Sequence, residues 1–126
     1  MTKIRNLLNF PWTLALILCA LISIPQKVSI NKEPFALVFK IKSFWWFELL
    51  PSSKGVRGMA MGNCVLLGPK EMDKDLEHEL IHVEQWNREP FIHFFLYNLE
   101  TLRKGYRQNK YEVEAYDGAG NVYLGK

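Results

Sequence analysis

Residues 76–83 read Leu-Glu-His-Glu-Leu-Ile-His-Val, and their apolar side chains recur with the period of an α-helix. Leu76, Leu80 and Val83 stand at positions i, i+4 and i+7, so they lie on one helix face. We expect this helix to run from Asp73 to Asn87, because a proline follows closely and the residue before a proline avoids the helical conformation. The stretch therefore predicts an amphipathic helix in the second half of the chain.

Two histidines on this helix are spaced as metal ligands. His78 and His82 are four residues apart, which separates them by about 40° around the helix axis, so both imidazoles can reach one Zn²⁺. Glu79 lies about 100° further round and can take a proton from a water molecule at the metal without being a ligand. The sequence thus predicts a zinc site with Glu79 as its catalytic base. The alternative is a polar helix face that carries two histidines by chance.

A third ligand is available thirty residues after His82. A catalytic zinc usually has three protein ligands and one open position. The segment 111–117 reads Tyr-Glu-Val-Glu-Ala-Tyr-Asp and supplies two candidates, Glu112 and Glu114. They are two residues apart, so a helix points them about 200° apart and only one can face the metal.

His-Glu-x-x-His followed by Glu-x-x-Ala on a later helix resembles the gluzincin metallopeptidases, in particular the membrane-bound CAAX-protease and HtpX-like group. The resemblance implies zinc as cofactor, peptide hydrolysis as activity and Glu112 as the third ligand, with Ala115 at the alanine position. The family's following aspartate falls on Tyr116. The last third of the chain is also similar to small uncharacterised bacterial proteins that carry His-Glu-x-x-His-x-x-Gln and a later Asn-Pro-x-Glu-x-Glu-Ala.

The N-terminal part of the chain is long, apolar and uncharged. Residues 6–26 contain no charged side chain, and they are flanked by Lys3, Arg5 and Lys27. About 20 apolar residues suffice to cross a bilayer, so we expect an uncleaved membrane anchor and membrane lipid as a partner. A cleaved signal peptide and a buried helix of a soluble protein are the alternatives. Basic residues on both sides leave the orientation in the membrane open.

The charge is distributed unevenly. Residues 1–42 hold six basic residues and one acidic residue, a net charge of +5, whereas residues 43–126 have a net charge of −2. A basic end suits anionic lipid headgroups. Nucleic acid is not an expected partner, because no basic stripe carries interleaved aromatic residues and the remainder is acidic.

The middle of the chain has the pattern of short strands. Residues 28–42 alternate in places, and residues 59–61 and 64–67 predict two strands joined by a tight turn at Gly62-Asn63. The aromatic run 44–50 fits either a buried strand or a segment pressed against the bilayer.

These patterns together predict an α+β protein: an N-terminal membrane-anchor helix, a small antiparallel β region and a helical, minimal zincin-like module. The expected boundaries are 1–27 for the anchor, 28–70 for the β-rich region and 71–126 for the metal-site module. Within that module, further helices are expected from Pro90 to about Arg107 and from Tyr111 to Asp117.

Three functions are compatible with this organisation. The first is a membrane-associated zinc-dependent peptidase that acts on a peptide or protein substrate. The second is a zinc-binding membrane accessory or regulatory protein without catalytic turnover, in which the same ligands form a structural site. The third is a membrane adaptor without a metal, which requires the histidine motif to be chance.

Overall fold

The computed structural model describes residues 2–32, 34–46, 57–69, 71, 74–105 and 108–119. These residues form helices and strands in the order α1 (Thr2–Ile22), β1 (Pro25–Asn31), β2 (Ala36–Ile41), β3 (Gly58–Met61), β4 (Cys64–Leu67), α2 (Asp75–Arg88), α3 (His93–Lys104) and α4 (Lys110–Ala119). The predicted α+β class is confirmed, and so is the hairpin of β3 and β4 around Gly62-Asn63.

The four strands form one mixed sheet in the order β1-β2-β4-β3. β1 and β2 pair antiparallel and so do β3 and β4, but β2 and β4 run parallel, with Leu37 opposite Cys64. The prediction of a purely antiparallel region is therefore wrong. β2 buries side chains on both faces, such as Val38 and Phe39, and β1 pairs with only one of its edges, so its second edge is open to a further strand. β4 fills that position, and β3 takes the outer edge.

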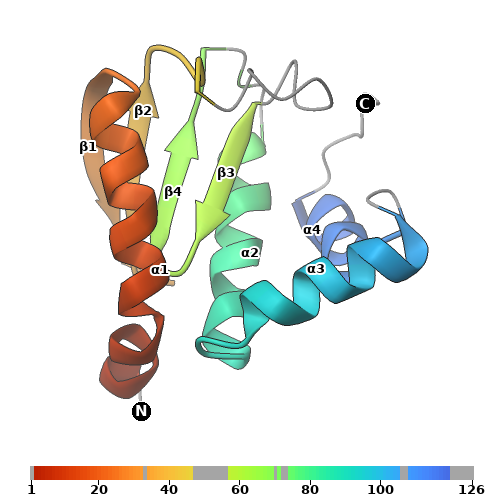
Figure 1. Cartoon of the computed structure of the whole chain (residues 1–126). Helices are drawn as coiled ribbons and strands as arrows, with labels where there is room; N and C mark the ends of the chain where they lie inside the picture. The colour runs from red at the N-terminus through yellow and green to blue at the C-terminus, as the bar shows by residue number, and fades with distance from the viewer. Residues whose placement is uncertain are drawn as a thin grey trace.

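Helices cover both faces of the sheet, with α1 on one side and α2 on the other (Figure 1). On the α1 side, Leu16 and Ala20 pack with Phe39, Ile41 and Leu66 in one buried cluster. On the α2 side, the buried cluster consists of Ala36, Val38, Val65, Leu67 and Val83. α4 packs beside α2, and α3 leads from the end of α2 to the start of α4 (Figure 1).

The residues expected to form the membrane anchor fold as α1, a helix of the core. Its buried face includes the polar residues Asn9 and Thr13. The Asn9 amide nitrogen donates to the carbonyl oxygen of Trp86 over 3.2 Å, and the Thr13 hydroxyl accepts from the backbone N–H of Asn63 over 2.8 Å. Polar residues such as these lower the mean hydropathy of the stretch that forms α1. Among the described residues, no helix is long and apolar enough to cross a membrane.

The β3–β4 turn sits unusually close to α1. Gly62 has a φ of 60°, and a Cβ atom there would lie 2.3 Å from the Thr13 hydroxyl oxygen. Only glycine combines this left-handed conformation with so near an approach. The turn predicted from Gly62-Asn63 is therefore also the point where the hairpin is fastened to α1.

The later helices differ from the predictions mainly at their ends. α3 starts three residues later than expected, after Phe91, whose φ of 68° is not helical, and it ends before Gly105, whose φ is 81°. In the aromatic run 44–50, Phe44 is buried in the core, and residues 47–50 lie outside the described part of the chain. Asp73, the expected start of the helix that carries the histidines, also lies outside the described residues.

Candidate metal centre

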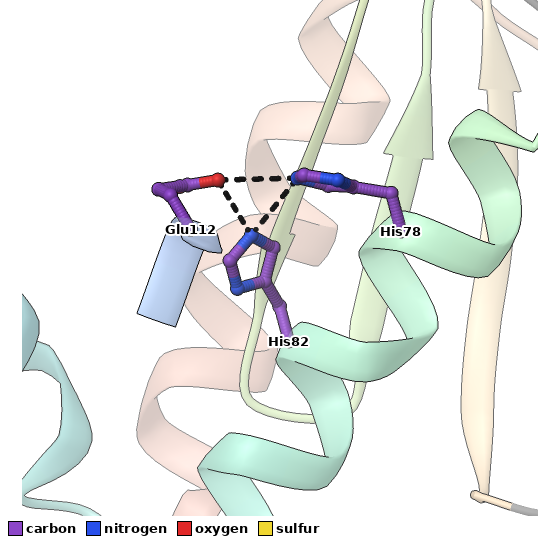
Figure 2. A group of neighbouring side chains, drawn as sticks. All are labelled: His78, His82 and Glu112. Carbon is purple, nitrogen blue, oxygen red and sulfur yellow. Dashed lines mark hydrogen bonds and ion pairs between the residues drawn. The ribbon is translucent and has the colours of Figure 1, made fainter. Parts of the chain in front are cut away.

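Two neighbouring helices bring His78, His82 and Glu112 together (Figure 2). His78 and His82 lie one turn apart on α2, and Glu112 reaches them from the first turn of α4. The Glu112 Oε1 atom is 3.1 Å from the Nε2 atom of each histidine, and the two Nε2 atoms are 3.2 Å apart. All three side chains are buried, so these distances belong to a closed cluster inside the protein.

The spacing of these three atoms fits a zinc ion. Tetrahedral ligands at about 2.0–2.1 Å from zinc are separated from each other by roughly 3.3 Å. The measured separations of 3.1–3.2 Å are close to that value without any movement of the helices. Two imidazole nitrogens and one carboxylate oxygen are also a donor set that zinc accepts, and three protein ligands leave one position open.

Gln85 determines which nitrogen of His82 can bind a metal. The Gln85 Oε1 atom is 2.8 Å from His82 Nδ1, while its Nε2 atom donates to the carbonyl oxygen of Tyr111 and to Glu114. An amide oxygen can only accept, so the proton of the neutral His82 ring resides on Nδ1. The lone pair of Nε2 then points at the Glu112 oxygen, and this arrangement needs a cation between the two atoms, either a proton or a metal ion.

The pKa shifts of His82 and Glu112 also indicate that a cation is needed between these two side chains. Burial alone lowers the pKa of His82, but the adjacent Glu112 carboxylate outweighs it and raises that pKa to about 9. Burial alone raises the pKa of Glu112, but the charge of His82 and hydrogen bonds from His78, His82 and Tyr97 hold it well below its usual range. The carboxylate is therefore ionised and attracts one positive charge.

The start of α4 places Glu112 accurately. Asn109 is fully buried and accepts the backbone N–H of Tyr111 through its side-chain oxygen, which caps the helix. Its amide nitrogen donates to the carbonyl oxygen of Tyr97 and to the hydroxyl of Thr101, which ties the cap to α3. Ala115 follows Glu112 on the same face and is also fully buried, so α4 can lie close to α2.

Glu114, the other candidate ligand, points elsewhere. One carboxylate oxygen accepts hydrogen bonds from Gln85 over 2.8 Å and from Arg88 over 2.6 Å, and the side chain is partly exposed. The bond from Arg88 is the main reason why the pKa of Glu114 is lowered. Glu114 therefore accepts a hydrogen bond from Gln85, the residue that orients His82. Of the two candidate ligands, only Glu112 belongs to the cluster.

Glu79 is buried next to the cluster and beside strand β3. A Cβ atom added at Gly58 would lie 3.1 Å from the Glu79 Oε2 atom, so this strand and the carboxylate are in close proximity. Burial raises the pKa of Glu79, and the nearby charges of Glu112 and Asp75 add to that rise, while His82 and His78 counteract it. A carboxyl group with a raised pKa is suited to accept and return a proton near neutral pH.

Aromatic residues enclose the cluster. Tyr97 of α3 donates its hydroxyl proton to Glu112 Oε2, and the Tyr116 ring packs against His78 with the ring centres 4.3 Å apart. Burial, together with the charge of Glu112, raises the pKa of Tyr97, so its hydroxyl remains a donor. Sequence reasoning missed Tyr97, because the start of α3 is apolar on almost every side and no spacing marks the tyrosine.

His93 lies outside the cluster. It is buried, its Nδ1 atom is 3.1 Å from a Glu89 carboxylate oxygen, and its ring packs against Tyr111. The same Glu89 oxygen accepts the hydroxyl of Tyr111. His93 is therefore a buried core residue that takes no part in the cluster.

Comparison with known proteins gives no further guidance, since no family model, curated protein or solved structure matches the chain.

Proposed function

We propose that this protein is a zinc-dependent peptidase. The observation that carries the proposal is the buried triangle of His78 Nε2, His82 Nε2 and Glu112 Oε1, whose sides of 3.1–3.2 Å match the spacing of zinc ligands. Glu79 lies beside this triangle with a raised pKa. Metal ligands with an adjacent carboxyl group form the arrangement required for metal-assisted hydrolysis.

The chain's own residues supply the proton transfers. Zinc, when bound, lowers the pKa of a coordinated water to about 7 and polarises a carbonyl group. The Glu79 carboxylate accepts a proton from the attacking water and then delivers it to the leaving nitrogen of the peptide bond. Gln85 holds His82 in the tautomer that presents Nε2, and Tyr97 keeps Glu112 oriented through its hydroxyl.

Strand β3 offers a place for an extended substrate. It is an outer strand of the sheet, and its first residue, Gly58, lies against Glu79. A peptide that adds to this edge as a further strand would pass directly by the carboxylate. This supports a peptide or an unfolded protein segment as the substrate class.

The chemistry of the site favours catalysis over a purely structural role for zinc. Structural zinc sites are closed by four protein ligands, usually with cysteines among them. Among the described residues, the group that can hold a metal comprises two histidines and one glutamate, and the buried thiol of Cys64 is not part of it. A zinc-binding accessory protein without turnover is the outcome that the experiment below separates from a peptidase.

The test combines metal analysis with a peptide-hydrolysis assay. We expect one zinc per purified chain and cleavage of at least some members of a mixed library of quenched fluorescent peptides. Glu79→Gln should retain the zinc and lose hydrolysis by about a hundredfold or more, because the base is removed while the ligands stay. Glu84→Gln is the matched control, since Glu84 lies exposed on the same helix and should leave both readings unchanged.

Two results would contradict the proposal. Full hydrolytic activity in Glu79→Gln would exclude the proposed base. Stoichiometric zinc without cleavage of any library member would identify a zinc-binding protein of the non-catalytic kind.

A further inference from the structure

Among the side chains that the structure describes, the outward face of α1 is apolar from Ile4 to Ile22. The buried face includes Asn9, Thr13, Leu16 and Ala20, which recur at helical spacing. The opposite face consists of exposed aliphatic and aromatic side chains, from Leu14 at 41% to Leu7 at 71%; its large members are Ile4, Leu7, Leu8, Phe10, Leu14, Leu18, Leu21 and Ile22. A helix at a protein–water boundary carries polar residues there, so another apolar phase must cover this face.

Neighbouring elements extend this apolar face. In β1, Val28 and Ile30 are exposed, and they pair in register with Phe39 and Leu37, which face the α1 side of the sheet. Trp45, which follows β2, is half exposed and donates its indole N–H to the carbonyl oxygen of Ile22 at the end of α1. The face thus continues from α1 across the adjoining sheet edge.

Trp12 connects α1 to a second group of exposed apolar side chains. Its ring stacks on Phe94 with the ring centres 4.4 Å apart and also contacts Phe91 and Phe95. Phe91 and Phe95 are 42% and 55% exposed, and further exposed residues follow Phe95 on one side of α3; they are Leu99 and Leu102. We call the exposed apolar side chains of α1, β1 and α3, together with Trp45, the apolar face.

The rim of the apolar face is basic. Lys27 and Lys42 are exposed beside the end of α1, Lys32 is exposed at the other end of β1, and residues 1–42 have a net charge of +5. Leucine, isoleucine and phenylalanine side chains bordered by tryptophan and then by lysine follow the order of a bilayer, from hydrocarbon through the interface to the anionic headgroups. Two copies of the chain meeting through this face would instead bring two basic rims together, which is unfavourable.

We propose that the apolar face docks on an anionic lipid bilayer, with α1 lying in the plane of the membrane surface. Asn9 and Thr13 hold α1 to α2 and to the β3–β4 turn, which favours a helix that stays on the sheet over one that crosses the bilayer. Its outward side chains therefore enter the interface while its inner face stays in the protein core. The proposal involves none of the metal-site residues, so it stands or falls separately from the peptidase.

The experiment measures flotation of the full chain with vesicles of phosphatidylcholine and about one third phosphatidylglycerol. We expect the unmodified protein to float with these vesicles. Leu18→Gln/Leu21→Gln should bind at least about tenfold more weakly, because two side chains no longer enter the hydrocarbon. The matched control is Leu76→Gln/Val113→Gln, which alters two exposed apolar side chains of α2 and α4 and should bind normally.

A second measurement uses the tryptophan fluorescence of the protein. Tryptophan fluorescence should be quenched by vesicles that contain brominated acyl chains, and Trp45→Phe should reduce that quenching, because Trp45 is half exposed whereas Trp86 is buried. Four outcomes would overturn the proposal. They are absence of flotation, equal binding by the two double variants, a lipid-free dimer that Leu18→Gln/Leu21→Gln dissociates, and retention in the membrane after alkaline extraction, which indicates a spanning segment.

Discussion

Gln85 is the residue that orients His82 in the proposed metal centre. It accepts from His82 Nδ1 over 2.8 Å and donates to the Tyr111 carbonyl, so it connects a proposed ligand on α2 with the backbone of α4. Residues that orient metal-bound histidines usually contribute about 10–100-fold to metal affinity.

We therefore predict that Gln85→Ala lowers zinc affinity by about 10–100-fold while the helices remain folded. Titration with a competing chelator of known affinity measures this change. Arg88→Ala is the control, because it removes the other partner of Glu114 and leaves His82 untouched. Equal affinity in Gln85→Ala and the unmodified protein would show that His82 needs no such support.

The shifted pKa values of His82 and Glu112 predict that the stability of the metal-free protein depends on pH. The pKa of His82 is raised to about 9 in the folded protein, so its contribution is complete below the unfolded value of about 6.5 and is lost as the pH rises through 9. The pKa of Glu112 is lowered, so its contribution is present above about 4.3 and is lost on acidification.

From these signs we predict that the free energy of unfolding of the metal-free protein falls by on the order of 2 kcal/mol between pH 6 and pH 9. Urea unfolding in the presence of a chelator measures it. Zinc should abolish this fall, because the metal takes the place of the proton on His82. The His82→Gln variant, measured in the presence of chelator, should not show this fall in stability. If the unmodified metal-free protein is equally stable at pH 6 and pH 9, the assignment of a raised pKa to His82 is wrong.

At the scale of the elements, the start of α4 matters most, since it carries Glu112 to α2. Asn109 caps this helix and also binds the Tyr97 carbonyl and the Thr101 hydroxyl, so one side chain fixes α4 against α3. The loss of a helix cap costs about 1 kcal/mol, and buried hydrogen bonds are lost with it here.

Accordingly, Asn109→Ala should destabilise the protein by about 1–3 kcal/mol and weaken zinc binding, because Glu112 is no longer held at the right distance. Thermal unfolding and chelator competition test the two effects. Asn98→Ala serves as the control, since Asn98 is an exposed residue of α3 whose side chain donates to the Phe94 carbonyl oxygen in its own helix turn. A destabilised variant with unchanged zinc affinity would show that the cap does not position Glu112.

The elements also show how far sequence patterns reach. The 3.6-residue period of 76–83, the glycine turn at 62 and the proline at 90 are local signals, and the structure contains the α2 helix, the hairpin and the helix end that they predict. The parallel pairing of β2 with β4 depends on which strand covers the second edge of β2. That choice depends on contacts between segments far apart in the chain, which no local pattern contains.

The same division applies to the candidate site. Spacing along one helix is enough to place His78 and His82 side by side, and the resemblance to gluzincins suggested Glu112. Tyr97 and Gly58 enter the site through packing between helices and a strand edge, so their spacing in the sequence carries no signal.

At the scale of the whole molecule, the uneven composition has a structural explanation. The uncharged N-terminal stretch was expected to span a membrane, but it forms a helix that covers one face of the sheet and turns an apolar side outward. The proposed metal centre lies with α2 and α4, and α2 covers the opposite face of the sheet. The outward side of α1 and the proposed metal centre therefore lie on opposite sides of the sheet.

The most direct test of the account is the zinc content of three purified proteins: the unmodified chain, Glu112→Gln and Glu114→Gln. The triangle of His78, His82 and Glu112 predicts one zinc per chain in the unmodified protein, loss of that zinc in Glu112→Gln and its retention in Glu114→Gln. Retention of zinc in Glu112→Gln together with its loss in Glu114→Gln, or absence of zinc from the unmodified chain, would contradict it.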